Sequence, residues 1–372
     1  MLRALKRRVR QAIGEILAFR DRARASRGRR RSEANALELR QELAAHALEL
    51  RSHPTSMILE PATACNLRCP FCPTGGGYPG LTKEILQPET FQKIVSNVRV
   101  DLLETVVLYN WGEPFVNKHI LDYIRYFSSR HVRTLISSNL SAADYSREWL
   151  RSLVESGLSQ LTVSIDGATQ ETYEKYRVRG DLARVLGNMK RLDEVKRELG
   201  VEYPFVIFRM LLTRHNQDEV EQARALAAEV GATFELSHHF WSPEEHREDW
   251  QADSLRSVGS EPLTEVYPRE TEEEIDTFCR HLWDSIVVNA NGDVFPCCLI
   301  YKKEHALGNL AEQHISEIRN NAEMKYLRQF AVDPEMAAPG FENHCESCTT
   351  RFCVTRMRRK PPQVATDAPV YA

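Results

Sequence analysis

The chain has 372 residues, of which 42% are hydrophobic and 27% charged, and its net charge is −3. These values are ordinary for a globular protein and allow one large domain plus a smaller one. The absence of an apolar run of about 18 residues excludes a transmembrane helix, and the broken, basic start excludes a secretory signal peptide. Nine clustered cysteines, an odd number, exclude a secreted disulfide framework and favour metal ligation in a reducing compartment.

The N-terminus is strongly basic. Residues 1–32 carry 12 Lys and Arg against two acidic residues. Apolar residues recur at spacings of three and four over residues 1–20, which predicts a helix with one apolar stripe and a basic face. Such helices lie on anionic membranes, so we expect peripheral membrane contact through residues 1–32. The alternative is a helix that packs on the protein's own catalytic domain. No nucleic acid partner is expected, because the basic run lacks interleaved aromatic residues.

A second helix is predicted over residues 33–52, and from residue 56 strands alternate with helices. Six strand–helix repeats predict an α/β fold with a parallel sheet and helices outside it. Two further units would be needed for a closed eight-fold barrel. The predicted strands cover 56–63, 104–111, 133–138, 160–166, 205–212 and 233–238. The predicted helices cover 88–98, 118–130, 145–156, 170–177, 182–198 and 217–230.

Three cysteines, Cys65, Cys69 and Cys72, follow the first predicted strand at the spacing C-x3-C-x2-C. Cysteine thiolates are the usual ligands of iron–sulfur clusters. A zinc site would require a fourth Cys or His nearby, and none follows before His119. A cubane with three protein ligands leaves one iron open to a small chelating ligand. The other readings of this loop are buried core cysteines and a zinc knuckle.

The ends of the next strands carry small and polar residues, where parallel sheets place their active-site groups. The second strand ends in Trp111-Gly112-Glu113-Pro114, the third contains Ser137, and the fourth ends in Ser164-Ile165-Asp166-Gly167, with Arg177 following. Each segment also suits an ordinary turn, and Asp166 suits a helix cap.

The three-cysteine loop and these strand ends resemble the radical S-adenosylmethionine (SAM) superfamily. In that family the open iron chelates SAM, and one electron cleaves SAM to methionine and a 5′-deoxyadenosyl radical. The resemblance implies a partial (βα)6 TIM-type barrel. It assigns SAM binding to five residues, although Trp111 replaces the first glycine of the family's Gly-Gly-Glu-Pro motif. These residues are Gly112, Glu113, Ser137, Ser164 and Arg177.

A second cysteine set lies near the C-terminus, around a hairpin predicted from residues 283–289 and 293–295 with its turn at Asn291-Gly292. This region resembles the SPASM or twitch domain of radical SAM enzymes, a small α+β domain that carries auxiliary 4Fe–4S clusters. The resemblance implies one auxiliary cluster, with Cys298 and Cys353 left over and Cys353 able to replace Cys348. Structural zinc is the alternative. The four expected ligands are Cys279, Cys297, Cys345 and Cys348.

We therefore expect a radical SAM oxidoreductase with two 4Fe–4S clusters and SAM as cofactors. The expected reaction is dehydrogenation of a sugar-like or aminocyclitol-like small molecule; the alternatives are redox-neutral epimerisation and maturation of a ribosomal peptide. A flavodoxin or ferredoxin would donate electrons, and the expected location is the cytoplasm, with membrane contact. The expected domains are a basic helical extension (1–50), the barrel (51–245), an acidic linker (246–276), the SPASM-like domain (277–355) and a flexible tail (356–372).

Overall fold

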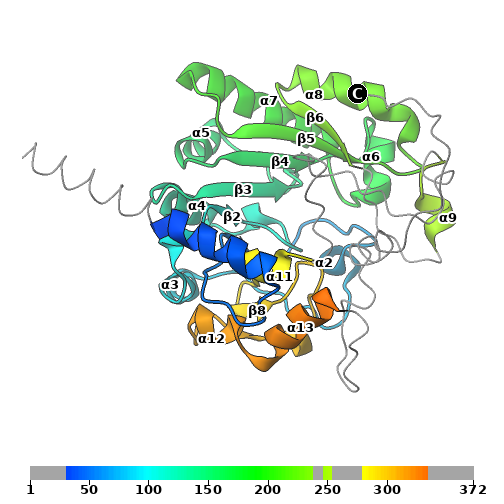
Figure 1. The fold of residues 1–372 in the computed structure, drawn as a ribbon. Helices are drawn as coiled ribbons and strands as arrows, with labels where there is room; N and C mark the ends of the chain where they lie inside the picture. The colour runs from blue at the N-terminus through cyan, green and yellow to red at the C-terminus, as the bar shows by residue number, and fades with distance from the viewer. Residues whose placement is uncertain (1–30, 238–245, 254–278, 334–372) are drawn as a thin grey trace, which may run out of the picture.

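The structure is a computed structural model, and it describes residues 31–237, 246–253 and 279–333. Within these ranges the chain forms a nine-stranded sheet of order β6-β5-β4-β3-β2-β1-β7-β8-β9. All neighbours from β6 to β7 are parallel, and β8 and β9 add antiparallel pairs at the other edge. The sheet does not close, so the α/β fold is the predicted partial barrel (Figure 1).

The six predicted barrel strands are confirmed, with the first, second and fourth ending a few residues earlier than expected. These three strands leave the sheet early because the residues that follow them bend into the loops of the site. The strands are β1 (Ser56–Leu59), β2 (Thr105–Val107), β3 (Arg133–Ser138), β4 (Gln160–Ser164), β5 (Phe205–Leu211) and β6 (Thr233–Ser237).

The predicted helices between the strands are also confirmed, and side-chain caps fix several starts. Ser146, Thr169 and Asp181 each accept a hydrogen bond from a backbone N–H in the first turn of α5, α6 and α7. The long α7 ends at Gly200, whose φ of 63° is left-handed. The barrel helices are α3 (Pro88–Ser96), α4 (Ile120–Ser128), α5 (Arg147–Glu155), α6 (Gln170–Tyr176), α7 (Leu182–Leu199) and α8 (Val220–Glu229). Short turns are α2 (Pro73–Gly76), η1 (Val100–Leu102), η2 (Pro114–Val116) and η3 (Gln217–Glu219).

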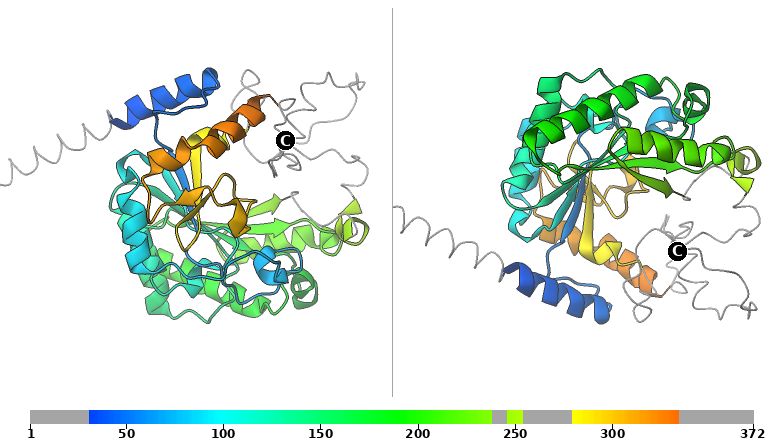
Figure 2. Two further views of the ribbon diagram at one scale, coloured as in Figure 1. Left: turned by 90° about the horizontal axis from the view of Figure 1, so that it is seen from below. Right: turned by 90° about the horizontal axis from the view of Figure 1, so that it is seen from above.

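Strand alternation separates the two faces of the sheet. Val206, Phe208 and Met210 of β5 belong to the main core, which the barrel helices cover from outside (Figure 2). Because successive strand residues point to opposite faces, Ile207 and Arg209 lie on the inner face. Among the described residues the barrel helices lie on the opposite face of the sheet, and the site is built on this inner face.

The predicted C-terminal hairpin is confirmed, and its first strand joins the barrel sheet. Strand β7 (Ser285–Val288) pairs in parallel with β1, and β8 (Asp293–Phe295) returns antiparallel through a turn at Gly292, whose φ is 94°. The domain continues through α11 (His281–Asp284), η5 (Lys303–His305), β9 (Gly308–Asn309), α12 (Ile315–Arg319) and α13 (Ala322–Val332).

The N-terminal segment packs on the C-terminal elements rather than on the barrel helices (Figure 2). A helix covers residues 31–44 and ends earlier than the predicted 33–52, at a turn where His46 has a φ of 49°. Leu39 and Leu43 share a hydrophobic cluster with Trp283 and Leu327. The helix predicted over residues 1–20 lies outside the described residues. None of the helices in the described ranges is long and apolar enough to cross a membrane.

Candidate active site

The three-cysteine loop connects β1 to α2 at the carboxyl edge of the sheet, as predicted. Hydrogen bonds tie the loop to the ends of other strands. The Cys72 thiol donates to the carbonyl oxygen of Trp111 (3.6 Å), and the backbone N–H of Arg68 donates to the carbonyl oxygen of Val178 (3.0 Å). The side-chain amide of Asn139 lies 3.6 Å from the Cys65 sulfur. The loop is therefore held in place by β2, β3 and the segment after α6.

The thiols lie in surroundings of low polarity. Burial, aided by the neighbouring Glu113 carboxyl, raises the pKa of Cys65 to about 12. Burial also raises the pKa of Cys69, while Arg177 acts in the opposite direction. A thiolate here needs a compensating positive charge, and metal binding supplies one as it releases the proton.

The turn after β2 is anchored by Glu60, a residue that the sequence pattern did not single out. One Glu60 carboxylate oxygen accepts from the backbone N–H groups of Trp111 (2.7 Å) and Gly112 (2.9 Å). A Cβ on Gly112 would lie 1.8 Å from the carbonyl oxygen of Ala62. Only glycine can therefore hold this close approach between the turn and the cluster loop.

Glu113 is the next residue of this turn, and both of its carboxylate oxygens accept hydrogen bonds. It accepts from Ser138 Oγ (2.7 Å), from the backbone N–H of Asn139 (2.8 Å) and from that of Phe115 (3.1 Å). Its side chain is buried, and burial raises its pKa. In this arrangement Glu113 joins the ends of β2 and β3, which positions the main chain of the turn.

Ser137 and Ser164, both assigned to SAM from the family resemblance, lie close together in the structure. Their hydroxyl oxygens lie 3.3 Å apart across the neighbouring strands β3 and β4. Both side chains are partly exposed on the inner face. Two hydroxyl groups at this spacing can donate to and accept from one polar ligand group.

Arg177 lies between the cluster loop and the end of β4. Its Nε donates to Asp166 Oδ2 at 2.5 Å, and its Nη1 lies 3.9 Å from the Cys69 sulfur. Burial lowers the pKa of Arg177, but Asp166 and Cys69 raise it by more, so the net shift is upward. Asp166 does not cap α6, because Thr169 does; its other oxygen accepts from the backbone N–H of Leu211. Asp166 therefore orients the guanidinium.

An ion pair on the inner face was also not singled out from the sequence. Arg209 of β5 and Glu235 of β6 are partners in register, and their Nε and Oε1 atoms lie 2.7 Å apart. On the neighbouring strand β4, the register partner of Arg209 is Ser164. Burial lowers the pKa of Arg209, but Glu235 and the Tyr109 side chain raise it by more. The sequence signal that could have revealed this ion pair is a single charged residue within the mostly apolar run of each strand.

The auxiliary site is described only in part, because Cys345, Cys348 and Cys353 lie outside the described residues. Cys297 follows β8, and its pKa is raised mainly by a hydrogen bond with the Cys298 thiol and by burial. Cys279 precedes α11. In the described ranges no three His, Cys, Asp or Glu side chains converge on one metal ion. The thiolates of a cubane each bind a different iron and need not converge in that way.

Aromatic residues cover the cluster loop. The Phe71 ring, between two of the cysteines, lies 5.2 Å from Trp250 and 6.3 Å from Tyr176, measured between ring centroids. Trp250 closes the short helix α9 (Arg247–Trp250), which lies in the segment predicted to be an acidic linker. The described part of that segment thus contributes to the site.

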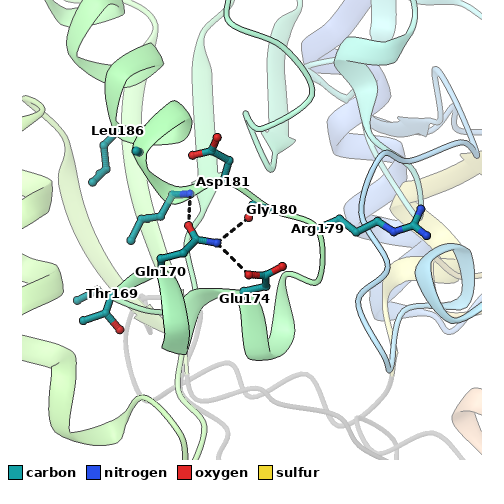
Figure 3. Close-up of a pocket in the computed structure, with 10 residues that line it drawn as sticks. Thr169, Gln170, Glu174, Arg179, Gly180, Asp181 and Leu186 are labelled. Carbon is teal, nitrogen blue, oxygen red and sulfur yellow. Dashed lines mark hydrogen bonds between the residues drawn. The ribbon is translucent and has the colours of Figure 1, made fainter.

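A separate pocket of about 670 Å³ opens between α6 and the start of α7. Thr169, Gln170, Glu174, Arg179 and Asp181 are among its lining residues (Figure 3). Gln170 fills part of it by donating to the carbonyl oxygen of Gly180. None of the predicted SAM residues lines this pocket, so its size alone does not make it the active site.

The fold and site define an α/β partial-barrel enzyme with a three-cysteine cluster loop. Residues 59–227 match the family model of the Radical SAM superfamily, and residues 279–349 match SPASM, an iron–sulfur cluster-binding domain. The chain belongs to the radical SAM superfamily and carries a C-terminal SPASM domain. Its cofactors are 4Fe–4S clusters and SAM.

Curated relatives support the same family with differing activities. The AdoMet-dependent heme synthase of Methanosarcina barkeri (strain Fusaro / DSM 804) is 24% identical over 180 residues, which are 48% of each chain. The mycofactocin maturase MftC of Mycolicibacterium smegmatis (strain ATCC 700084 / mc(2)155) is 26% identical over 191 residues, 50% of this chain and 44% of that protein. The chain thus spans about half the length of the curated relatives it matches.

Solved structures share the fold. Streptococcus suis SuiB bound to S-adenosylmethionine has a TM-score of 0.57 at 15% identity, covering 90% of this chain and 79% of that one. The AdoMet-bound protein anSMEcpe has a TM-score of 0.54 at 14% identity, covering 81% of this chain and 85% of that one.

The residues present fit these cofactors. Three thiols occupy one loop, a glycine turn approaches them closely, and Glu60 Oε2 and the Asn110 amide are buried without a hydrogen-bond partner in the described chain. When bound, the cluster and SAM supply one-electron cleavage of SAM to methionine and a 5′-deoxyadenosyl radical. The chain's own contribution is to hold the thiolates, to fix the turn through Glu60 and Glu113, and to orient Arg177.

Proposed function

We propose that the chain oxidises a polyhydroxylated small molecule of the sugar or aminocyclitol class, removing one hydrogen from a carbon and one from the hydroxyl or amine group which that carbon bears. The 5′-deoxyadenosyl radical takes one hydrogen atom from that carbon. Loss of one further electron and one proton then gives the ketone or imine. The substrate therefore loses two hydrogens in total, and one electron needs an acceptor.

The observation that carries this proposal is the Arg209–Glu235 pair. Its side chains are 32% and 33% exposed, so the pair remains accessible to a ligand on the inner face. A guanidinium beside a carboxylate offers donors and acceptors with no net charge. Hydroxyl and amine groups use both, so this pair suits a polyol better than an apolar or strongly anionic molecule.

The assignments to individual residues are part of the proposal. Gly112 and Glu113 would present the turn to the methionine end of SAM, and Ser137, Ser164 and Arg177 would hold its polar groups. Cys65, Cys69 and Cys72 would ligate the SAM-binding cluster. The second cluster would be held by Cys279, Cys297, Cys345 and Cys348 and would supply the electron acceptor. A reducing compartment, the cytoplasm, suits these thiols.

The experiment is anaerobic reconstitution with SAM and dithionite, followed by mass spectrometry of polyol and aminopolyol candidates. A product lighter by two hydrogens supports dehydrogenation. Deuterium uptake from heavy water, with no mass loss in ordinary water, would instead show that the reaction is an epimerisation. Glu235→Gln should lower oxidised product while SAM cleavage continues. The matched control is Glu221→Gln, which alters an exposed ion pair with Arg224.

A second candidate is maturation of a ribosomal peptide. It is favoured by the similarity in fold to SuiB, a structure of which is titled as bound to the precursor peptide SuiA, and by the partial identity to mycofactocin maturase MftC. Modification of a peptide by the reconstituted enzyme, with all polyols left unchanged, would establish this candidate instead.

A further inference from the structure

Two arginines are buried where the C-terminal domain meets the N-terminal segment. Arg319 is the last residue of α12 and Arg328 lies within α13, and their exposed fractions are only 3% and 0%. A buried charge is costly unless an opposite charge pairs with it. In the part of the chain that the structure describes, both guanidinium groups donate only to backbone carbonyl oxygens, and the Nε of Arg319 and the Nη2 of Arg328 find no acceptor.

The two guanidinium groups bind the helix that follows Cys279, a predicted ligand of the second cluster. Arg328 Nε donates to the carbonyl oxygen of Leu282 (3.1 Å), and Arg319 Nη2 donates to that of Trp283. Both carbonyl groups belong to α11, which begins two residues after Cys279. The two arginines are therefore bound about one helical turn along the chain from this cysteine.

Nearby carboxylates compensate the two arginines only in part. Burial lowers the pKa of Arg319 to about 10 and that of Arg328 to about 9, and repulsion from Arg319 adds to the effect on Arg328. Glu42 attracts both guanidinium groups and acts against burial. Asp284 also attracts Arg319, but its carboxylate already pairs with Arg280 at 3.1 Å. An excess of positive charge thus remains buried beside α11.

We propose that Arg319 and Arg328 supply this positive charge to the second 4Fe–4S cluster and raise its reduction potential. The inference rests on the second cluster of the proposed function and not on its substrate. A cluster held by thiolates is anionic, and it gains one more negative charge when it is reduced. Buried positive charge nearby therefore stabilises the reduced form more than the oxidised form.

A raised potential suits a cluster that accepts an electron. In the proposed oxidation the substrate radical gives one electron to the oxidised cluster and one proton to water, and a carbon–oxygen or carbon–nitrogen double bond forms. The cluster is reduced by one electron in this step. The two arginines act on the cluster through their charge, so their effect is measurable without any substrate.

The test is an anaerobic redox titration of the second cluster, followed by the EPR signal of its reduced form. It uses the full chain with Cys65, Cys69 and Cys72 changed to Ala, so that the second cluster titrates alone. In this background Arg328→Met removes one buried charge, and Arg328→Lys keeps it. A purely structural role would lower the melting temperature in both variants and leave the potential unchanged.

Two further variants sharpen the test. Lys325→Met is the matched control, because Lys325 lies three residues earlier in α13, is partly exposed and pairs with Glu49 (2.8 Å). Glu42→Gln changes the charge in the opposite direction. Gln keeps an acceptor oxygen for the backbone N–H of Arg51 (2.6 Å) but removes the negative charge that faces both arginines.

We expect Arg328→Met to lower the equilibrium constant for reduction about tenfold, a shift of about 59 mV for one electron. Arg328→Lys and Lys325→Met should stay near the potential of the background, and Glu42→Gln should raise it. Equal potentials for Arg328→Met and Lys325→Met would overturn the inference. If Arg328→Met does not fold, an unchanged potential in Glu42→Gln would overturn it as well.

The same titration separates this inference from the proposed function. Zinc or no metal in the chain that lacks the first three cysteines would overturn the second cluster, and with it both the inference and the proposed electron acceptor. The expected shifts in potential, together with no oxidised product from any polyol, would support the inference and overturn only the proposed substrate.

Discussion

Replacing Glu60 with Gln tests how the end of β1 holds the turn after β2. Glu60 is fully buried, and burial raises the pKa of its carboxyl from 4.5 to about 8, against the two backbone hydrogen bonds that lower it. The folded chain thus binds this proton more tightly than the unfolded chain. The stability that the bound proton contributes is fully present below the pKa of Glu60 in the unfolded chain. It is lost as the pH rises toward the pKa of Glu60 in the folded chain.

The size of the effect follows from this pKa. Each unit of pKa difference corresponds to about 1.4 kcal/mol. Between about pH 6 and about pH 9 the wild type should lose roughly 3 kcal/mol through Glu60, because the loss stops near the folded pKa. Gln keeps the acceptor oxygen for Trp111 and Gly112 but does not titrate. The free energy of unfolding of Glu60→Gln, relative to wild type, should therefore rise by roughly 3 kcal/mol over this range.

The assay is anaerobic urea denaturation of both proteins at the two pH values. Glu221→Gln is the matched control, because its carboxylate is 83% exposed. Glu60→Ala should be less stable than Glu60→Gln by about 2–3 kcal/mol at every pH, since two backbone N–H groups lose their acceptor and neither variant titrates at this position. A difference between Glu60→Gln and wild type that stays constant with pH would refute the reasoning.

Three further predictions concern cofactors and the N-terminus. Changing Cys65, Cys69 and Cys72 together to Ala should remove half of about eight irons per chain and all SAM cleavage; full iron content by chemical analysis would contradict the ligand assignment. Cys297→Ala should still cleave SAM but lose oxidised product, with the melting profile as the control for folding; full product yield from a folded variant lacking the second cluster would exclude electron transfer through it. Deleting residues 1–32 should abolish binding to anionic vesicles while SAM cleavage continues; equal vesicle binding by both forms would remove the membrane hypothesis.

The sequence by itself determined the order of the barrel elements and the position of the cluster loop. These features are local: strand and helix periodicities and the spacing of three cysteines all lie within short stretches of chain. Such patterns also located the turn at Asn291-Gly292, because a left-handed residue favours glycine.

Only the tertiary structure decided which distant residues meet. Strand β7 lies beside β1, Glu60 accepts from Trp111 and Gly112, and Arg209 faces Glu235. These contacts depend on strand order and register. A slip of one residue in register would move every side chain of a strand to the opposite face of the sheet. Local periodicity carries no information on such pairing, so the inner-face ion pair became visible only once the sheet was assembled.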